Sequence, residues 1–420
     1  MEVIKIRGGN ALSGSVTVQG AKNAVLPILA GSIINGGKSV IHNCPDLKDV
    51  RISLDILRCL GCEATFENGT VTVDSANASL SEIPPNLMGA MRSSVVFAGA
   101  LLNRMGKAYM TYPGGCNLGH RPIDLHLKAF SRLGIIINEE HGAISFTADS
   151  ILPARIFLEF PSVGATENII LAACRGKGLT TIINAAREPE ICDLQNFLNS
   201  MGADIKGAGT DTIEIRGVSE FKDTEYTVMP DRIVASTYMA SVAVAGGSAE
   251  INGIIPNHVS AFIAVMRECG ATVNVRDKSV YIAAPKYIRP VKMINTLPYP
   301  GFPTDAQSLI MSVMSVARGT SIIKENIFGS RFSHAGELMR MGADISVADK
   351  IAVVRGVRKL SGCNVCATDL RSGASLVVAG LGADGETTVS NVCYIDRGYE
   401  KLEENLKILG ADIERIESGD

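Results

Sequence analysis

The sequence has little net charge, no long apolar run and no common metal-binding spacing. Forty basic and forty-three acidic residues leave a net charge of −3, which argues against a general surface for nucleic acid or acidic membranes. No apolar run approaches the roughly 20 residues that span a bilayer, and the opening MEVIKIRGGN lacks the pattern of an export signal. We therefore expect a cytoplasmic protein that binds neither nucleic acid nor membrane, with any anion-binding site being local.

The ten cysteines are scattered along the chain, which is unlike a small disulfide framework. The six histidines show no H-E-x-x-H spacing. Two C-x-x-C pairs, Cys59 with Cys62 and Cys363 with Cys366, lie far apart in the sequence, whereas zinc ribbons usually keep their pairs within about 20 residues. We therefore predict no metal site.

What the sequence does contain is an internal repeat. A helix end, a glycine and a strand recur six times, 68 to 73 residues apart, at Gly61, Gly134, Gly202, Gly270, Gly342 and Gly410. An amphipathic helix pattern precedes each glycine, and a segment that is apolar nearly all round precedes that helix. Each repeat is thus expected to run strand, buried helix, strand, surface helix, strand, strand.

Six such repeats predict two α/β lobes of three repeats each. One lobe covers residues 20–229, and the other covers residues 230–420 together with residues 1–19. The sixth repeat ends one strand short, and the N-terminal runs VIKIRG and SVTVQG are available to complete it. This arrangement would place the two chain ends side by side.

The buried helices all begin with polar or charged residues, and helix N-termini attract anions. If these ends meet between the lobes, the crevice there should bind anions. The residues concerned are Lys22, Asn23, Arg92, Thr166, Glu167, Asp231, Arg232, Asp305 and Arg371.

Cys116 lies in the stretch YPGGCNLGHRPIDLH, beside two glycines that let the backbone turn tightly. The nearby Arg121 and a helix start favour its thiolate. A small buried apolar cysteine is the plainer alternative. Arg331 and Arg397 occupy places equivalent to that of Arg121 in the fifth and sixth repeats, which predicts an arginine-lined anion site.

Asp305 follows Gly-Phe-Pro-Thr at the first turn of a buried helix. It could cap that helix. A carboxylate among arginines could equally act as a general base.

The motifs QGAKNA, PGGC, RPIDLH, PSVGATEN, FPTD and IDRGYE, spread over the whole chain, carry a resemblance to the UDP-N-acetylglucosamine 1-carboxyvinyltransferase family. The resemblance implies a two-lobed inside-out α/β barrel of six βαβαββ units, with the active site in the cleft between the lobes. It implies transfer of enolpyruvyl from phosphoenolpyruvate to the 3′-hydroxyl of UDP-N-acetylglucosamine, with release of phosphate, in peptidoglycan precursor synthesis. No metal or organic cofactor is implied.

The resemblance also implies residue roles. Cys116 would be an acid or a covalent partner of the pyruvyl group, Asp305 the base, and Lys22 a further catalytic group. Phosphoenolpyruvate would be bound by Lys22, Arg92, Arg121, Arg371 and Arg397. UDP-N-acetylglucosamine would be bound by Asn23, Arg92, Arg121, Pro122, Ile123, Asp124, Leu125, Ser162, Val163, Gly164, Asp305 and Ile327. Fosfomycin is expected to alkylate Cys116, while Phe160 stands where some members have a lysine that contacts phosphate.

Two other functions compete with this expectation. A 5-enolpyruvylshikimate-3-phosphate synthase would share the fold and the reaction class, but Cys116 in its PGGC loop argues against it. A non-catalytic sugar-nucleotide binder would have no use for a positioned acid and base.

Overall fold

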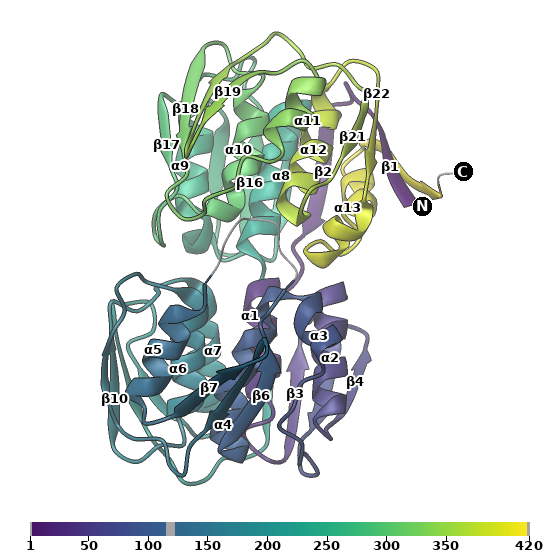
Figure 1. The fold of residues 1–420 in the computed structure, drawn as a ribbon. Coiled ribbons are helices and arrows are strands. Elements are labelled where there is room, and N and C mark those ends of the chain that lie inside the picture. The colour runs from purple at the N-terminus through teal and green to yellow at the C-terminus, as the bar shows by residue number, and fades with distance from the viewer. Residues whose placement is uncertain (1, 115–121, 418–420) are drawn as a thin grey trace. The chain divides into compact units, whose positions relative to one another are not determined.

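A computed structural model describes residues 2–114 and 122–417 (Figure 1). The chain divides into two compact units. We call residues 20–114 and 122–229 the first unit, and residues 2–19 and 230–417 the second unit. Cys116 and Arg121 lie outside the described residues.

The first unit contains three buried helical segments. They can lie in the interior because their side chains are small or apolar on nearly every face. In the first of them, nine of ten residues are buried. More amphipathic helices cover the outside, each with one apolar face packed inward. The buried segments are α1 (Lys22–Gly31), η1 (Arg92–Val96) continuing into α4 (Phe97–Met105), and α6 (Val163–Ala173), and the others are α2 (Lys48–Cys59), α3 (Pro85–Ala90), α5 (Asp124–Arg132) and α7 (Pro189–Ser200).

Three sheets surround these helices in the first unit. Burial alternates along their strands, as a half-buried sheet requires. The strand orders are β13 (Thr224–Thr227), β3 (Lys38–His42), β5 (Thr70–Asp74), β4 (Glu63–Glu67); β6 (Lys107–Thr111), β8 (Ala143–Thr147), β7 (Ile136–Glu140); and β11 (Asp204–Lys206), β12 (Thr212–Arg216), β10 (Leu179–Ile183), β9 (Arg155–Phe157).

The second unit repeats the plan. Its buried helical segments are α8 (Arg232–Ala245), η3 (Thr304–Ala306) continuing into α10 (Gln307–Met314), and α12 (Leu370–Gly382). Its outer helical segments are η2 (Pro256–Val259), α9 (Ser260–Glu268), α11 (Ala335–Arg340), η4 (Val392–Arg397) and α13 (Leu402–Ile408). The strand orders are β15 (Thr272–Val275), β16 (Ser279–Ala283), β14 (Gly247–Asn252), β2 (Leu12–Thr17); β17 (Met293–Asn295), β18 (Thr320–Lys324), β20 (Ile351–Arg355), β19 (Asp344–Ala348); and β21 (Asn364–Cys366), β22 (Glu386–Ser390), β1 (Glu2–Arg7), β23 (Asp412–Glu417).

The repeated glycines each follow the outer helix of a repeat and adopt positive φ, the left-handed conformation that terminates a helix at low cost only for glycine. Their φ angles lie between 78° and 105° at Gly61, Gly134, Gly202, Gly270, Gly342 and Gly410. The glycine therefore recurs in the sequence because the backbone at the end of each outer helix requires a positive φ.

The N-terminal strands were predicted to complete the sixth repeat together, and this is half right. Strand β1 lies between β22 and β23 and is antiparallel to both, so the chain ends are side by side. Strand β2 instead runs parallel to β14, with residues 12–17 against 247–252. In exchange, β13 runs parallel to β3 in the first unit. The prediction failed for β2 because the alternating pattern of a strand does not specify which sheet supplies its partner.

Candidate active site

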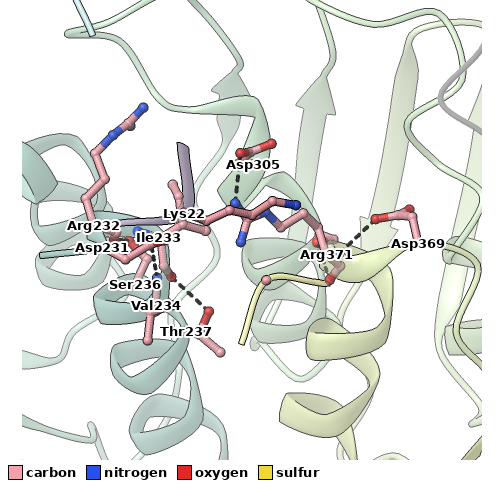
Figure 2. A network of polar contacts seen from close by, with 12 residues as sticks. Lys22, Asp231, Arg232, Ile233, Val234, Ser236, Thr237, Asp305, Asp369 and Arg371 are labelled. Atoms are coloured by element: carbon pink, nitrogen blue, oxygen red, sulfur yellow. Dashed lines mark hydrogen bonds and ion pairs between the residues drawn. The ribbon is translucent and has the colours of Figure 1, made fainter. Parts of the chain in front are cut away.

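Asp305 lies in the second unit, in the single turn η3 that leads into α10. Its two carboxylate oxygens contact different arginines: Arg331 Nη2 is 2.9 Å from Oδ1, and Arg371 Nη2 is 3.1 Å from Oδ2 (Figure 2 shows the second pair). Both arginines are almost completely buried, whereas 26% of the Asp305 side chain is exposed. The carboxylate is thus held in place from one side and still reachable from another.

The charge around Asp305 is mainly positive. Burial alone would raise its pKa, but the charges of Arg371, Arg331 and Arg232 outweigh burial and hold the pKa of Asp305 well below its usual value. Asp305 is therefore ionised at neutral pH, in the form that can accept a proton. Three guanidinium groups around one carboxylate also leave positive charge for a further anion.

Arg371 is positioned by the N-terminus of α12. Asp369 caps this helix, with Oδ1 accepting from the backbone N–H of Arg371 at 2.8 Å (Figure 2). The same oxygen accepts from the backbone N–H of Ser372 at 3.1 Å, and the Ser372 hydroxyl accepts from the backbone N–H of Asp369, which completes a capping box. The guanidinium of Arg371 also donates to the Tyr399 hydroxyl at 3.4 Å. Its direction toward Asp305 is therefore set by the capped start of α12 and by Tyr399.

Glu325 is a buried residue to which we assigned no role from the sequence. One of its oxygens accepts from the Thr304 hydroxyl at 3.0 Å, and the other accepts from the backbone N–H groups of Ile327 at 2.8 Å and Phe328 at 3.1 Å. Thr304 precedes Asp305, so Glu325 ties the loop containing Ile327 to the turn containing Asp305. In the sequence, Glu325 stands two residues before the candidate Ile327, and this is the signal that could have pointed to it.

Arg397 is the last residue of η4, and it is half-buried. The preceding Asp396 forms an ion pair with Arg415 of β23 at 2.6 Å, which fixes η4 against the edge of its sheet. Two residues on, buried Tyr399 contacts Arg371. The turn carrying Arg397 is thus connected to the arginine cluster around Asp305.

In the first unit, Lys22 begins α1 and is 94% buried. Its Nζ lies 2.7 Å from Oδ2 of Asp49, which is buried on α2. Asn23 follows on the same turn and is half-buried. A buried ammonium needs such a carboxylate, because an isolated charge away from water is very costly.

The two helix starts predicted to hold the sugar nucleotide lie together in the first unit. His126 of α5 bonds through Nδ1 to Asn168 of α6 at 2.8 Å, and a Cβ added at Gly164 would lie 3.2 Å from the His126 ring. Residues 122–125 are therefore close to Ser162, Val163 and Gly164. Asn168 also donates to the carbonyl of Val95 at 3.0 Å, which joins η1, and with it the start at Arg92, to the same group.

Acidic side chains also gather in the first unit. Burial, together with the charges of Glu190 and Glu188, raises the pKa of Glu167 well above its usual value. Glu167 was predicted to belong to an anion-binding helix start, yet it adds no positive charge there. Arg92 donates to the carbonyl of Pro113 at 3.4 Å, just ahead of the undescribed segment that holds Cys116 and Arg121.

Among residues 2–114 and 122–417, no group of three or more histidine, cysteine or acidic side chains is placed to hold a metal ion. Within the same ranges, no helix has both the length and the apolar character needed to cross a membrane.

The family model described as EPSP synthase (3-phosphoshikimate 1-carboxyvinyltransferase) matches residues 6–406. The chain belongs to this family. Among curated relatives, it is 52% identical over 99% of its length, and 100% of the relative's, to UDP-N-acetylglucosamine 1-carboxyvinyltransferase 2 of Caldanaerobacter subterraneus subsp. tengcongensis. It is 47% identical to UDP-N-acetylglucosamine 1-carboxyvinyltransferase 1 of Symbiobacterium thermophilum, over 98% of this chain and 94% of the relative.

Solved structures agree on the fold. The enolpyruvyl transferase NikO from Streptomyces tendae is 27% identical, with a TM-score of 0.89 over 99% of this chain and 98% of that one. An EPSP synthase from Acinetobacter baumannii is 20% identical, with a TM-score of 0.76 over 99% and 100% of the two chains. The predicted family and fold class are confirmed.

Proposed function

We propose that this protein transfers enolpyruvyl from phosphoenolpyruvate to the 3′-hydroxyl of UDP-N-acetylglucosamine and releases phosphate. The observation that carries the proposal is the 45–52% identity, over nearly full length, to relatives named for this activity. The EPSP synthase alternative is disfavoured, because the solved EPSP synthases are only 19–20% identical and share the fold alone.

In this proposal the reaction proceeds by addition and then elimination. The sugar oxygen bonds to C2 of the donor while C3 takes up a proton, which gives a tetrahedral ketal. Loss of phosphate and of a C3 proton then restores the double bond. Cys116 supplies the proton to C3, and Asp305 accepts the proton from the sugar hydroxyl.

The electrostatics of Asp305 support its proposed role as a base. Before the donor binds, the surrounding arginines keep the pKa of Asp305 low, which makes the carboxylate a weak base. A bound donor carries phosphate and carboxylate charges that would offset Arg331 and Arg371, and this would raise the pKa of Asp305 toward the operating pH. Asp305 would then become a stronger base only when the donor is present.

The remaining proposed contacts follow the charges of the substrates. Lys22, Arg92, Arg121, Arg371 and Arg397 would bind the doubly anionic donor. The starts of α5 and α6, with Asn23 and Ile327, would bind the sugar nucleotide, since helix N-termini favour its diphosphate.

The direct test is phosphate release on mixing both substrates. Cys116→Ala and Asp305→Ala should each lower kcat by at least about a hundredfold, the range that general acid–base groups contribute. Asp344→Ala is the matched control, because Asp344 forms a largely exposed ion pair with Arg355 at 3.1 Å. Absence of phosphate release from the folded wild type would favour the non-catalytic binder, and turnover of shikimate 3-phosphate in place of the sugar nucleotide would favour the other transferase.

Fosfomycin sharpens the assignment of Cys116. We expect the epoxide to abolish activity and to add its mass to Cys116, because the same cationic site would attract its phosphonate. Exposed Cys59 and Cys393 serve as internal controls and should stay unmodified. Unchanged activity together with an unmodified Cys116 would contradict this expectation.

A further inference from the structure

Gln19 has no place in the proposed mechanism, although it opens the motif QGAKNA. It is half-buried and is the last residue of the second unit before the chain enters the first unit at Gly20. Its backbone carbonyl accepts from the N–H of Asp231 at 2.9 Å, and Asp231 follows directly after the return crossing at residues 229–230. Gln19 thus bonds one crossing segment of the chain to the other.

The side chain of Gln19 makes a second pair of bonds. Its Nε2 donates to the carbonyl of Gly398 at 3.3 Å, and its Oε1 accepts from the backbone N–H of Glu400 at 2.7 Å. One amide therefore holds both sides of Tyr399, immediately after Arg397. Because donor and acceptor are both used, the turn has a defined orientation that a smaller or apolar side chain would not impose.

Tyr399 connects the turn held by Gln19 to the arginines around Asp305. It is buried, and its hydroxyl lies 3.0 Å from the Thr237 hydroxyl and 3.4 Å from Arg371 Nη1. Arg371 in turn contacts Asp305. The turn is also tight, since a Cβ at Gly398 would lie 2.5 Å from a Leu370 side-chain carbon. A shift at residues 398–400 would therefore move Arg397 and disturb Arg371 together.

We propose that Gln19 is a positioning residue that sets the orientation of Arg397 from the segment joining the two units. This inference rests on the proposed function, in which Arg397 binds the anionic donor. It predicts that Gln19 affects the donor more than the sugar nucleotide, because its bonds end at the Arg397 turn.

The test replaces Gln19 by Met, which keeps a similar length but removes both bonds. Asn199→Leu is the matched control, because the Asn199 amide also bonds backbone in both directions, to the Ile205 carbonyl at 2.8 Å and its N–H at 3.0 Å. Asn199 lies at the end of α7 in the first unit, among none of the site residues. Gln19→Met should raise KM for phosphoenolpyruvate about tenfold, the effect of losing one or two hydrogen bonds, with KM for the sugar nucleotide changed less than about twofold. Asn199→Leu should leave the ratio of the two constants as in the wild type.

A double-variant cycle tests the route of the effect. If Gln19 acts chiefly through Arg397, adding Gln19→Met to Arg397→Ala should raise KM for the donor by about threefold or less in place of about tenfold, with the remainder acting through Tyr399 and Arg371. Faster hydrogen exchange at residues 398–400 in Gln19→Met would support the same route without relying on turnover. An inactive wild type would overturn the proposed function. An active wild type in which both variants change the two Michaelis constants alike, or in which the two effects simply multiply, would overturn this inference alone.

Discussion

The two units share one plan, but each encloses a different charged group at the start of one buried helix. In the second unit, a carboxylate, Asp305, is surrounded by arginines. In the first unit, an ammonium, Lys22, is held by the buried carboxylate of Asp49, and burial, together with acidic neighbours, raises the pKa of Glu167. The repeat therefore supplies helix ends of similar geometry, and individual side chains decide which charge each end holds.

The largest effect on the free energy of unfolding is expected at the buried pair of Lys22 and Asp49 in the first unit. Lys22→Met leaves the buried Asp49 carboxylate without its ammonium, and we expect a loss of about 3–5 kcal/mol in the free energy of unfolding. Arg51→Met is the control, since Arg51 lies on α2 with Asp49, but its pair with Asp46 is about half exposed and should cost less than about 1 kcal/mol. Denaturant unfolding of both variants measures the difference.

A second substitution checks the cause. Lys22→Met combined with Asp49→Leu should recover most of the lost stability, because an apolar pair replaces the buried charges. A single variant no less stable than Arg51→Met would show that the buried pair contributes little.

Two aspartates, one in each unit, extend the comparison to pH. Burial raises the pKa of Asp193 to about 6, against opposing hydrogen bonds from Tyr226 at 2.6 Å and the Met229 N–H at 3.1 Å, whereas Asp305 is shifted downward. A raised pKa means that the folded state holds the proton more tightly. The stability from Asp193 is therefore present at low pH and lost as pH rises from about 4 through 6.

Asp193→Asn should remove this pH dependence, because the amide keeps the shape and can bond both partners without a charge. Relative to the wild type, the variant should gain about 3 kcal/mol between pH 4 and pH 7. Thermal or urea unfolding across this range provides the measurement. Parallel stability curves for the two proteins would mean that Asp193 titrates as an ordinary carboxyl.

The smallest expected contrast concerns helix caps. Asp369 caps α12 with two short bonds, whereas Ser162 caps α6 with one bond of 3.4 Å to the N–H of Ala165. Asp369→Ala should cost about 1–2 kcal/mol and Ser162→Ala less than about 0.5 kcal/mol. Chemical denaturation gives both values, and equal losses would remove this difference between the units.

Much of the fold could be predicted from the sequence, since each glycine of the repeat meets a backbone need and each buried helix is apolar on all faces. The partner of β2 could not, because its alternating pattern does not specify which sheet it joins, and it pairs with β14. At the candidate site, charged residues such as Asp305 and Arg371 were visible as motif members. Asp49 and Glu325 were not assigned, since their partners Lys22 and Thr304 are brought near them only by tertiary folding.

The position of β1 has a consequence for synthesis on the ribosome. This strand is made before residues 20–229, yet it pairs with β22 and β23, which are made after them. All strands of the first unit's three sheets lie within residues 20–229, and the last of them, β13, pairs with β3. These sheets can therefore form as soon as residues 20–229 have left the ribosome. Strand β1 stays without these partners until β22 and β23 have been translated, which makes it a segment in need of protection from wrong partners during biogenesis.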